Sequence, residues 1–206
     1  MKTKLIAISG KLKHGKDSLA DYIKSELFHY ILLDILYRND AELVVKMSFA
    51  DPIKEAVWKM FPDLTKEDLW GPSQNRSKII ENHINPLTGD PLTIRDCLTS
   101  IGAWGRSCNE AFWASAAVKK ANKLIKKDTI VIISDCRYKN EKEAVEKAGG
   151  IVIRVIRPDV GFTTTDPSEV DLDGTSLSEY DYVVNNTGLE ALRQQAKDIA
   201  AKLYNQ

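Results

Sequence analysis

The order of hydrophobic and polar residues switches repeatedly between short apolar runs, typical of buried strands, and stretches in which apolar residues recur every three or four positions, typical of helices. The first switch comes early: the apolar run 4–9 leads into the polar segment 10–18 and then into a helical pattern. We predict a strand, a loop and a helix from Asp17 to about residue 30, with the apolar pattern continuing through 31–37 before the polar residues 38–40. The predicted inward face of this helix comprises Leu19, Ala20, Ile23, Leu27 and Phe28.

The rest of the chain alternates in the same way. Strands are predicted over the apolar runs 43–49, 129–134, 151–156 and 182–184. Helices are predicted at 51–61, from 65, at about 73–83 inside the irregular segment 71–91, and at 94–108, 110–126, 139–148 and 188–204, with a polar loop at 159–175. Asp51 and Thr93 are expected to cap their helices. Because strands that alternate with helices form parallel sheets, we expect an α/β fold with about five parallel strands and helices on both faces.

The segment 10–18 has the composition of a loop that binds phosphate. Gly10 and Gly15 permit backbone angles and close approaches that a side chain would block, so the loop amides can turn inward towards an anion at the start of the helix. Lys16 would then reach the β- and γ-phosphates of a nucleotide. Asp17 stands where this motif usually has Ser or Thr as a Mg²⁺ ligand; it could bind the metal directly or through water, or leave it to Ser18. The alternative is a Gly- and Lys-rich turn with Asp17 as a helix cap.

A second group of charged residues follows the most apolar strand. Asp135 ends this strand, where a second acidic residue would hold Mg²⁺. Arg137 would point to the same side and could clamp a phosphate with two hydrogen bonds. Asn140 and Glu141 begin the next helix, and Glu141 could accept hydrogen bonds from a sugar, a base or Arg137. Each of these residues could instead be a helix cap or a solvated helix residue.

Ligands of open parallel sheets bind beyond the carboxyl ends of the strands. Polar or charged positions fall at or just beyond four predicted strand ends: Ser9–Gly10, Asp51, Asp135 and Arg157. Their convergence predicts a binding crevice along this edge of the sheet.

The middle of the chain offers groups for a second phosphate and for a base. Three arginines could grip a phosphate or lie exposed at the surface: Arg76, Arg95 and Arg106. Three aromatic residues could stack on a base or fill the core, and we expect two of the three in the core: Trp104, Phe112 and Trp113. In the phosphate loop, His14 could donate a hydrogen bond, whereas a phosphoryl transfer needs no histidine base.

Composition and charge narrow the range of partners. The 206 residues suffice for one large domain or two small ones, and 43% are hydrophobic, enough for a substantial core. The 29 basic residues balance 29 acidic ones, so no overall positive field favours a nucleic acid or an anionic membrane, whereas a local pocket for a small anion remains open. Cys97, Cys108 and Cys136 lack metal-ligand spacing and favour reduced thiols in a cytoplasmic protein. No secretory signal or membrane-spanning apolar run is visible.

Together these segments resemble the deoxynucleoside monophosphate kinases of tailed bacteriophages, members of the P-loop nucleoside monophosphate kinase superfamily. The resemblance spans nearly the whole chain and is patchy at 31–43 and 70–92. It is carried by the blocks 9–21 (with Gly-Lys-Asp in place of Gly-Lys-Ser/Thr), 49–54, 101–102, 112–113, 135–141, 149–150, 153–158, 168–169 and 184–192.

The resemblance implies a P-loop kinase three-layer sandwich in a single domain, 1–206, with a helical insertion at about 51–126 that binds the acceptor and covers the site. It implies that ATP, with Mg²⁺, phosphorylates a deoxynucleoside monophosphate to the diphosphate, in the host cytoplasm if the chain is phage-encoded. The expected partners are ATP and the deoxynucleoside monophosphate, with no nucleic acid and no membrane. Phage relatives are often dimers, which leaves a homodimer open.

The expected site residues follow from the motifs and the resemblance together. Those expected to act in catalysis are Lys16, Arg137 and Asp135. Those expected to bind ATP are Gly10, Lys13, His14, Gly15, Lys16, Asp17, Ser18 and Arg157. Those expected to bind the acceptor are Lys11, Asp51, Lys54, Arg76, Arg95, Gly102, Trp113, Asp135, Arg137 and Glu141. Those expected to hold Mg²⁺ are Asp17, Ser18 and Asp135. The chain departs from the family pattern at Ala103, often Thr in relatives, and at Leu12, where a basic residue is expected.

Two other functions fit the same residues. The animal-type phosphomevalonate kinase has a similar Gly-Lys-Asp loop, so a kinase of another small phosphate ester is one alternative. A non-catalytic nucleotide-binding module is the other, because Asp17 stands in the usual metal position. The aromatic residues near Trp113 favour an acceptor that carries a base.

Overall fold

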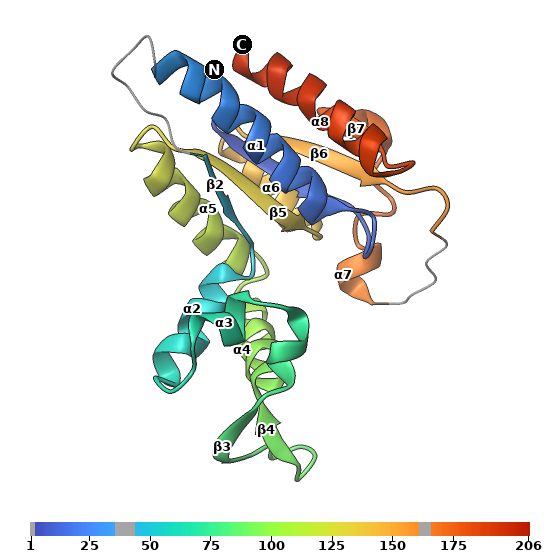
Figure 1. The fold of residues 1–206 in the computed structure, drawn as a ribbon. Coiled ribbons are helices and arrows are strands. Elements are labelled where there is room, and N and C mark those ends of the chain that lie inside the picture. The colour runs from blue at the N-terminus through green and yellow to red at the C-terminus, as the bar shows by residue number, and fades with distance from the viewer. Residues whose placement is uncertain (1–2, 36–43, 161–165) are drawn as a thin grey trace. The chain divides into compact units, whose positions relative to one another are not determined.

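The computed structural model describes residues 3–35, 44–160 and 166–206 (Figure 1). The chain folds into two compact units, one formed by residues 1–49 and 117–206 and the other by residues 50–116. We call them the sheet unit and the helical unit.

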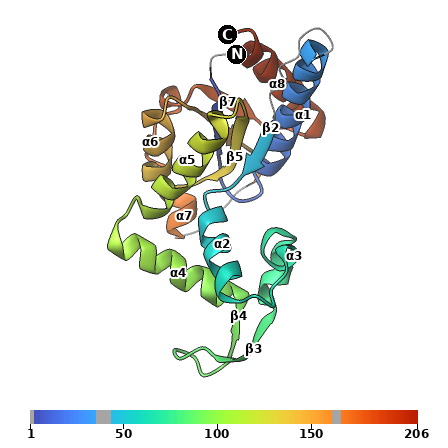
Figure 2. The same ribbon diagram turned by 90° about the vertical axis from the view of Figure 1, so that its left-hand side faces the viewer.

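The sheet unit is built on five strands in the order β2-β5-β1-β6-β7, and every neighbouring pair is parallel. The strands are β1 (Leu5–Ser9), β2 (Val44–Met47), β5 (Ile130–Cys136), β6 (Ile151–Ile156) and β7 (Tyr182–Asn185). Figure 2 shows helices on both sides of this sheet, with α1 and α8 on one side and α5 and α6 on the other. The helices are α1 (Lys16–Ile35), α5 (Phe112–Ile125), which begins in the helical unit, α6 (Lys139–Lys147) and α8 (Leu189–Tyr204). The predicted α/β fold, with about five parallel strands between layers of helices, is confirmed.

The apolar runs form strands because both faces of the sheet are covered. The four residues Ile130 to Ile133 of β5 are completely buried, as expected for a central parallel strand. On α1 the predicted inward face is correct for Leu19, Ala20, Ile23 and Leu27, all without exposed surface. The assignment of Phe28 to that face is wrong: its side chain is 46% exposed, because it is adjacent to Leu27 and turns about 100° away from it. The helix continues to Ile35, and the predicted polar break at 38–40 lies outside the described residues.

The helical unit has its own core and contains a hairpin that the sequence pattern did not predict. Its elements are α2 (Asp51–Met60), α3 (Lys66–Trp70), the 3₁₀ helix η1 (Ser73–Ser77), β3 (Ile79–Ile84), β4 (Pro91–Thr93) and α4 (Ile94–Cys108). Its core groups Val57, Leu64, Leu69, Ile80, Ile94 and Cys97.

Two predictions for the helical unit are wrong. The helix expected at about 73–83 is one 3₁₀ turn followed by β3, because Asn85 and Asp90 close a turn that pairs β3 with β4 antiparallel. Asp51 does not cap α2: Ala50 is the N-cap residue, and the Asp51 carboxylate accepts a hydrogen bond from the indole of Trp70 instead. The predicted cap at Thr93 is correct, since its hydroxyl accepts a hydrogen bond from the amide of Asp96.

The polar loop predicted at 159–175 contains a short helix, α7 (Pro167–Val170), and the 3₁₀ helix η2 (Leu177–Glu179) follows it. Asp166 caps α7, because its carboxylate accepts a hydrogen bond from the amide of Ser168. In this way one helical turn carries Glu169 into a buried position.

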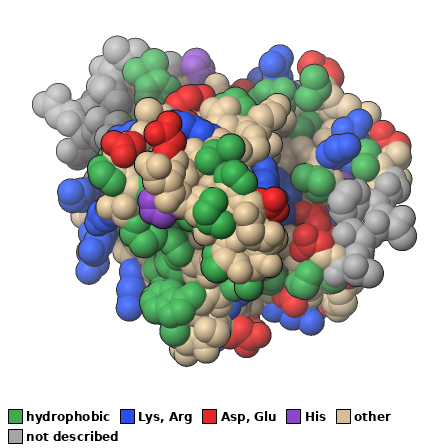
Figure 3. All heavy atoms as spheres, turned by 90° about the horizontal axis from the view of Figure 1, so that it is seen from below, with side chains coloured by type: hydrophobic (Ala, Val, Ile, Leu, Met, Phe, Trp, Pro, Cys, Tyr) green, Lys and Arg blue, Asp and Glu red, His purple; other side chains and the backbone are tan. Residues whose placement is uncertain are grey.

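Charges of both signs are scattered over the surface, in agreement with the balanced composition. Figure 3 shows basic and acidic side chains among hydrophobic ones on one face of the molecule. Among the residues that the structure describes, no helix combines the length and the apolar composition needed to cross a bilayer.

Leu27 and Phe28 provide a matched test of the helix face. Leu27→Ala should lower the free energy of unfolding of the sheet unit by about 2–5 kcal/mol, because it leaves a cavity in a closed core. Phe28→Ala should change it by less than about 1 kcal/mol, because the ring is largely solvated. Denaturant unfolding followed by circular dichroism measures both changes. Tryptophan fluorescence would report on the helical unit instead, because all four tryptophans lie there. Equal losses in the two variants would contradict this packing.

Candidate functional site

The loop between β1 and α1 has a backbone that requires both of its glycines. A Cβ on Gly10 would lie 2.8 Å from the carbonyl oxygen of Val155. Gly15 has φ +97°, and a Cβ there would lie 2.6 Å from the amide nitrogen of Asn186. Asn186 in turn donates a hydrogen bond to the carbonyl of His14, at 2.9 Å. The loop is therefore held closely against the ends of β6 and β7. A side chain at either glycine would displace the loop from these strand ends.

Lys16 lies inside this loop. Its ammonium donates hydrogen bonds to the carbonyls of Gly10 (2.6 Å) and Lys11 (2.8 Å), and the residue is only 7% exposed. Burial, and next the positive charge of Arg137, lower the pKa of Lys16 to about 8. The loop therefore holds a buried cation whose charged form is disfavoured, and a bound anion would stabilise that form.

The charges that act on Lys16 come from both predicted motifs and from Glu169 on α7. After burial, the largest influences are the charges of Arg137, Glu169, Asp17 and Asp135. Arg137 opposes the charge of Lys16, whereas the three carboxylates favour it. The structure thus brings the phosphate loop and the Asp135 region together around one ammonium group, as their places at neighbouring strand ends suggested.

Two carboxylates near Lys16 are oriented by partners that the sequence pattern did not predict. Asp17 accepts a hydrogen bond from the hydroxyl of Ser134, at 2.8 Å. Lys46 on β2 lies 3.8 Å from Asp17 and 2.7 Å from Asp21. Asp135 accepts a hydrogen bond from the amide of Phe49, at 2.6 Å. Ser134 and Asp135 are adjacent at the end of β5, so this strand orients both acidic groups.

The donors available to a metal here are oxygens. Asp17, Ser18 and Asp135 offer carboxylate and hydroxyl groups, which suit a hard cation such as Mg²⁺. Within residues 3–35, 44–160 and 166–206, no three His, Cys, Asp or Glu residues gather into a metal cluster.

Arg137 is held from its backbone and from its side chain. One oxygen of Glu141 accepts hydrogen bonds from the amides of Arg137 (2.7 Å) and Tyr138 (3.1 Å) at the start of α6. Burial raises the pKa of Glu141 to about 8, although these two amides favour its charged form. The guanidinium of Arg137 forms an ion pair with Glu169. Glu141 thereby fixes the backbone from which Arg137 extends.

The remaining expected residues of the sheet unit lie in or beside the loop. The Nδ1 atom of His14 lies 3.3 Å from the carbonyl of Val155, and burial lowers the pKa of its ring. Lys11 forms an ion pair with Asp173, at 2.7 Å. Lys13 is exposed and has φ +62°, so the loop turns at this residue. Arg157 follows β6 and lies 3.6 Å from Asp159.

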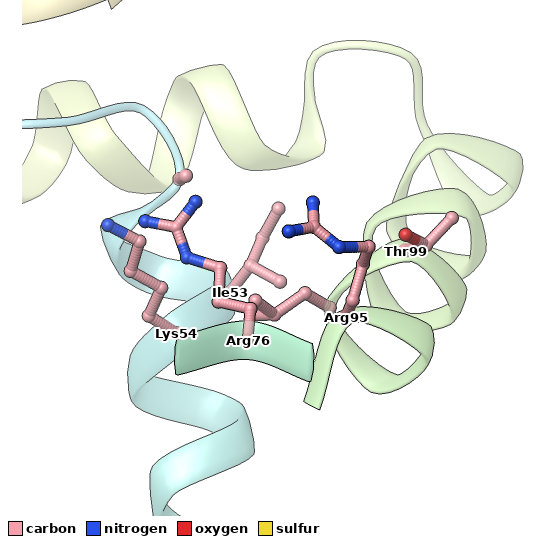
Figure 4. A pocket seen from close by; sticks show the side chains of 7 residues that line it. Ile53, Lys54, Arg76, Arg95 and Thr99 are labelled. Atoms are coloured by element: carbon pink, nitrogen blue, oxygen red, sulfur yellow. The ribbon is translucent and has the colours of Figure 1, made fainter. Parts of the chain in front are cut away.

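A separate pocket lies within the helical unit. It has a volume of about 230 Å³ and is lined by Ala50, Ile53, Lys54, Arg76, Arg95, Leu98 and Thr99. Figure 4 shows the charged ends of Lys54, Arg76 and Arg95 extending to the same side, with Ile53 between the two arginines. Three of the expected acceptor residues thus line one pocket with an apolar floor.

The two arginines of this pocket are not paired with a carboxylate of the described residues. Burial, and next the charge of Arg95, lower the pKa of Arg76, and its buried Nε has no hydrogen-bond partner. Arg95 donates to the backbone carbonyl of Ser73, at 3.0 Å. In the part of the chain that the structure describes, neither arginine forms an ion pair, whereas Lys54 lies 3.8 Å from the carboxylate of Asp51. The pocket therefore has excess positive charge that an anionic group would balance.

Gly105 on α4 makes room for the indole of Trp113, and the carbonyl of Gly102 accepts its hydrogen bond. A Cβ on Gly105 would lie 2.3 Å from the indole nitrogen, which donates a hydrogen bond to the carbonyl of Gly102 at 3.0 Å. The expectation that two of the three nearby aromatic residues fill the core is wrong: Trp104 is 58% and Phe112 37% exposed, and Trp113 is partly buried. They pack edge to face with one another and leave apolar ring surface exposed.

Three side chains that organise the loop were given no role in the sequence analysis: Ser134, Glu169 and Asn186. Ser134 could have been noticed as a polar residue near the end of an otherwise apolar strand. Glu169 and Asn186 reach the loop from positions more than 150 residues away in sequence, and no periodicity or spacing encodes such a contact.

Comparisons with known proteins point in one direction. A family model described as deoxynucleotide monophosphate kinase matches residues 65–196, well over half of the chain. The chain is also 28% identical, over 203 residues, to a protein of Acanthamoeba polyphaga mimivirus that carries the provisional name deoxynucleotide monophosphate kinase. That alignment covers 93% of each of the two proteins.

The buried ammonium of Lys16 should give stability a characteristic pH dependence. Its pKa is about 8 in the folded protein and has the ordinary value of 10.5 in the unfolded chain. Between these values the unfolded chain binds more protons, so the contribution of Lys16 should raise the free energy of unfolding as the pH rises from about 8 to 10.5. The rise should be on the order of 1–3 kcal/mol.

This contribution can be isolated by comparing the wild type with Lys16→Met in denaturant unfolding at a series of pH values. The wild type should gain stability relative to the variant over this pH range, because the variant has no ammonium to titrate. If the free energies of unfolding of the two proteins changed in parallel with pH, the pKa of Lys16 would not be lowered in the folded state.

Proposed function

The chain belongs to the deoxynucleotide monophosphate kinase family, and we propose that it performs the family's transfer with the phosphate loop around Lys16, Arg137 and the arginine pocket of the helical unit. The enzyme is a kinase, with ATP as co-substrate. The observation that carries the proposal is the presence of two places built for an anion: the glycine loop that encloses the ammonium of Lys16, and the pocket whose two arginines form no ion pair within the described residues. A kinase of this class needs two such places, because both of its substrates carry phosphate.

ATP is assigned to the loop between β1 and α1. The loop amides and Lys16 would hold the β- and γ-phosphates, since the end of a parallel strand and the start of a helix together attract anions. Its residues are Gly10, Lys13, His14, Gly15, Lys16, Asp17 and Ser18, with Arg157 beyond the end of β6. Replacing the two carbonyl partners of Lys16 by anionic phosphate oxygens would raise the pKa of this buried ammonium towards its ordinary value.

Mg²⁺ is assigned to Asp17, Ser18 and Asp135. The metal, when bound with ATP, supplies neutralisation of the phosphate charge. The contacts of Ser134 with Asp17 and of Phe49 with Asp135 support this assignment, because they hold the two carboxylates in place.

The acceptor monophosphate is assigned to the pocket of Lys54, Arg76 and Arg95. At about 230 Å³ the pocket is smaller than the roughly 300–1,000 Å³ that enclose a whole drug-sized ligand, so the phosphate end of a larger molecule is the part that fits. Guanidinium groups suit this end because they bind phosphate oxygens in pairs. Lys11, Asp51, Gly102, Trp113, Asp135, Arg137 and Glu141 complete the proposed acceptor contacts.

The proposed reaction needs no protein nucleophile and no general base. An oxygen of the acceptor phosphate forms a bond to the γ-phosphorus of ATP, while the bond from that phosphorus to the oxygen bridging it to the β-phosphate breaks. The products are ADP and a deoxynucleoside diphosphate. The acceptor phosphate is already largely doubly ionised at neutral pH, since its second pKa is about 6. Lys16 and Arg137 stabilise the charge that spreads over the transferred group.

The exposed aromatic cluster supports an acceptor that carries a base. Trp104, Phe112 and Trp113 pack edge to face and leave ring surface exposed, and such surface suits stacking on a base. A phosphomevalonate-like acceptor would leave this surface without a function. The non-catalytic module gains no support from the arginine pocket, because binding ATP alone does not require a second anion site.

Phosphoryl transfer is tested by measuring ADP release from ATP and Mg²⁺ with dAMP, dCMP, dGMP, dTMP and phosphomevalonate as acceptors. We expect release with at least one deoxynucleotide and none with phosphomevalonate. Lys16→Ala should lower turnover by about 10²–10³-fold, because it removes a charge aimed at the transferred phosphates.

Lys197→Ala is the matched control, because this lysine is exposed on α8. It should leave turnover unchanged. ATP binding by the wild type without release with any acceptor would favour the non-catalytic module instead.

Arg76 tests the acceptor assignment separately. Arg76→Ala should raise the KM for the deoxynucleotide about 10–100-fold and leave the KM for ATP within about twofold. A charged hydrogen-bond pair contributes roughly 1.5–3 kcal/mol, and 1.4 kcal/mol corresponds to a factor of ten. Arg76 is more informative than Arg95, whose hydrogen bond to Ser73 would also be lost.

The control is Arg193→Ala, which removes an exposed arginine stacked on Tyr22 in the sheet unit. Its kinetic constants should match the wild type. If Arg76→Ala changed the two KM values equally, the pocket would not be specific for the acceptor.

A further inference from the structure

One carboxylate connects the phosphate loop to Arg137. Glu169 lies on α7, and its side chain is only 5% exposed. One of its oxygens accepts a hydrogen bond from the amide of Leu12, at 2.6 Å, and the other accepts from Nη1 of Arg137. Two donors of this kind hold a buried carboxylate firmly in one orientation.

Glu169 lies where two positive charges would otherwise repel each other. Arg137 is close enough to disfavour the charge of Lys16, and Glu169 acts on Lys16 in the opposite sense. Phosphate would balance the two cations in a complex with nucleotide. Without nucleotide, Glu169 is the carboxylate that pairs directly with Arg137 among the residues that the structure describes.

The contact uses only one side of the guanidinium. Glu169 and, at 3.5 Å, the hydroxyl of Ser168 both contact Nη1. Nε and Nη2 of Arg137 have no hydrogen bond or ion pair within the described parts of the chain. These two nitrogens form the edge of a guanidinium that binds two phosphate oxygens at once. Glu169 can therefore hold Arg137 without occupying the edge that a phosphate needs.

The segment that carries Glu169 is attached at two further points. Asp171 accepts a hydrogen bond from the amide of Lys139, at 2.6 Å, and Asp173 forms the ion pair with Lys11. Neither contact reaches the guanidinium of Arg137. A variant at Asp171 thus separates the docking of the segment from the specific contact made by Glu169.

We propose that Glu169 is a positioning residue for phosphoryl transfer: it fixes the guanidinium of Arg137 beside Lys16 and keeps the Nε–Nη2 edge directed to the transferred phosphate. Glu169 itself contacts no substrate. The inference rests on the proposed function, because Arg137 must act on a phosphate for its orientation to matter. It extends that function to a residue outside both predicted motifs.

Glu169→Gln tests the proposal with the deoxynucleotide that gives the highest wild-type rate. The variant keeps the size of the side chain and removes its charge. We expect kcat to fall about 10–100-fold, with the KM for ATP and the calorimetric Kd for ATP within about threefold of the wild type. Glu169→Asp, which keeps the charge on a shorter side chain, should recover part of the lost kcat. The melting temperature of each variant shows whether it is folded.

Two controls separate positioning from other effects. Asp171→Asn weakens the docking of the segment, and Glu143→Gln makes the same chemical change at an exposed ion pair on α6. Both should keep kcat within about threefold of the wild type. A loss in Asp171→Asn equal to that in Glu169→Gln would assign the effect to docking and overturn the proposal. Tighter ATP binding or faster turnover in Glu169→Gln would also overturn it, because Glu169 would then compete with phosphate.

A double-mutant comparison decides whether Glu169 acts through Arg137. In an Arg137→Gln background, Glu169→Gln should lower kcat by less than about threefold further, since the side chain to be positioned is already absent. Multiplicative losses would overturn the proposal while leaving the kinase assignment intact. A wild-type protein that phosphorylates none of the four deoxynucleotides would instead refute the proposed function, and the positioning role with it.

Discussion

The main physical constraint on the site is the free-energy cost of burying the ammonium of Lys16 away from water. Two loop carbonyls and three carboxylates compensate this charge, and burial still lowers its pKa to about 8. The loop can hold the lysine this way only because Gly10 and Gly15 allow the backbone to pass so close to Val155 and Asn186. The glycines, the strand ends and the surrounding acidic groups therefore serve one requirement, a preformed positive site for phosphate.

The same requirement recurs in the helical unit with a different solution. Lys54 has Asp51 nearby, whereas Arg76 and Arg95 line the pocket without a carboxylate partner in the described chain. An arginine keeps its charge under burial better than a lysine does, because its ordinary pKa is so high. Uncompensated charge can therefore be carried by arginine in the pocket, while the lysine of the loop needs three carboxylates around it.

Local patterns in the sequence predicted what local physics determines. The strand, glycine loop and helix of 4–30, the apolar strand before Asp135 and the cap at Thr93 all depend on neighbouring residues, and all were found. The hairpin of β3 and β4 was missed because its pairing depends on the turn at 85–90 and not on periodicity. Phe28 and two of the three aromatic residues Trp104, Phe112 and Trp113 were expected in the core. Phe28, Trp104 and Phe112 are exposed, because hydrophobicity alone does not report which partners a face has. Glu169 was found only as part of a resemblance, because its contact with Leu12 joins residues 157 apart.

The net charge of the chain is zero, so the charges around Lys16 and Arg137 matter more for nucleotide binding than the overall charge does. A net charge of zero excludes a strong overall field, so attraction for a nucleotide must come from short-range imbalance at particular sites. The cations of the site have to stay in place when no ligand is bound. The carboxylates around Lys16 favour its charged form, and one of them, Glu169, also holds Arg137. A carboxylate that took every donor of Arg137 would inhibit the site, and one that took none would let the two cations separate. Glu169 contacts one nitrogen of the guanidinium, which satisfies both conditions.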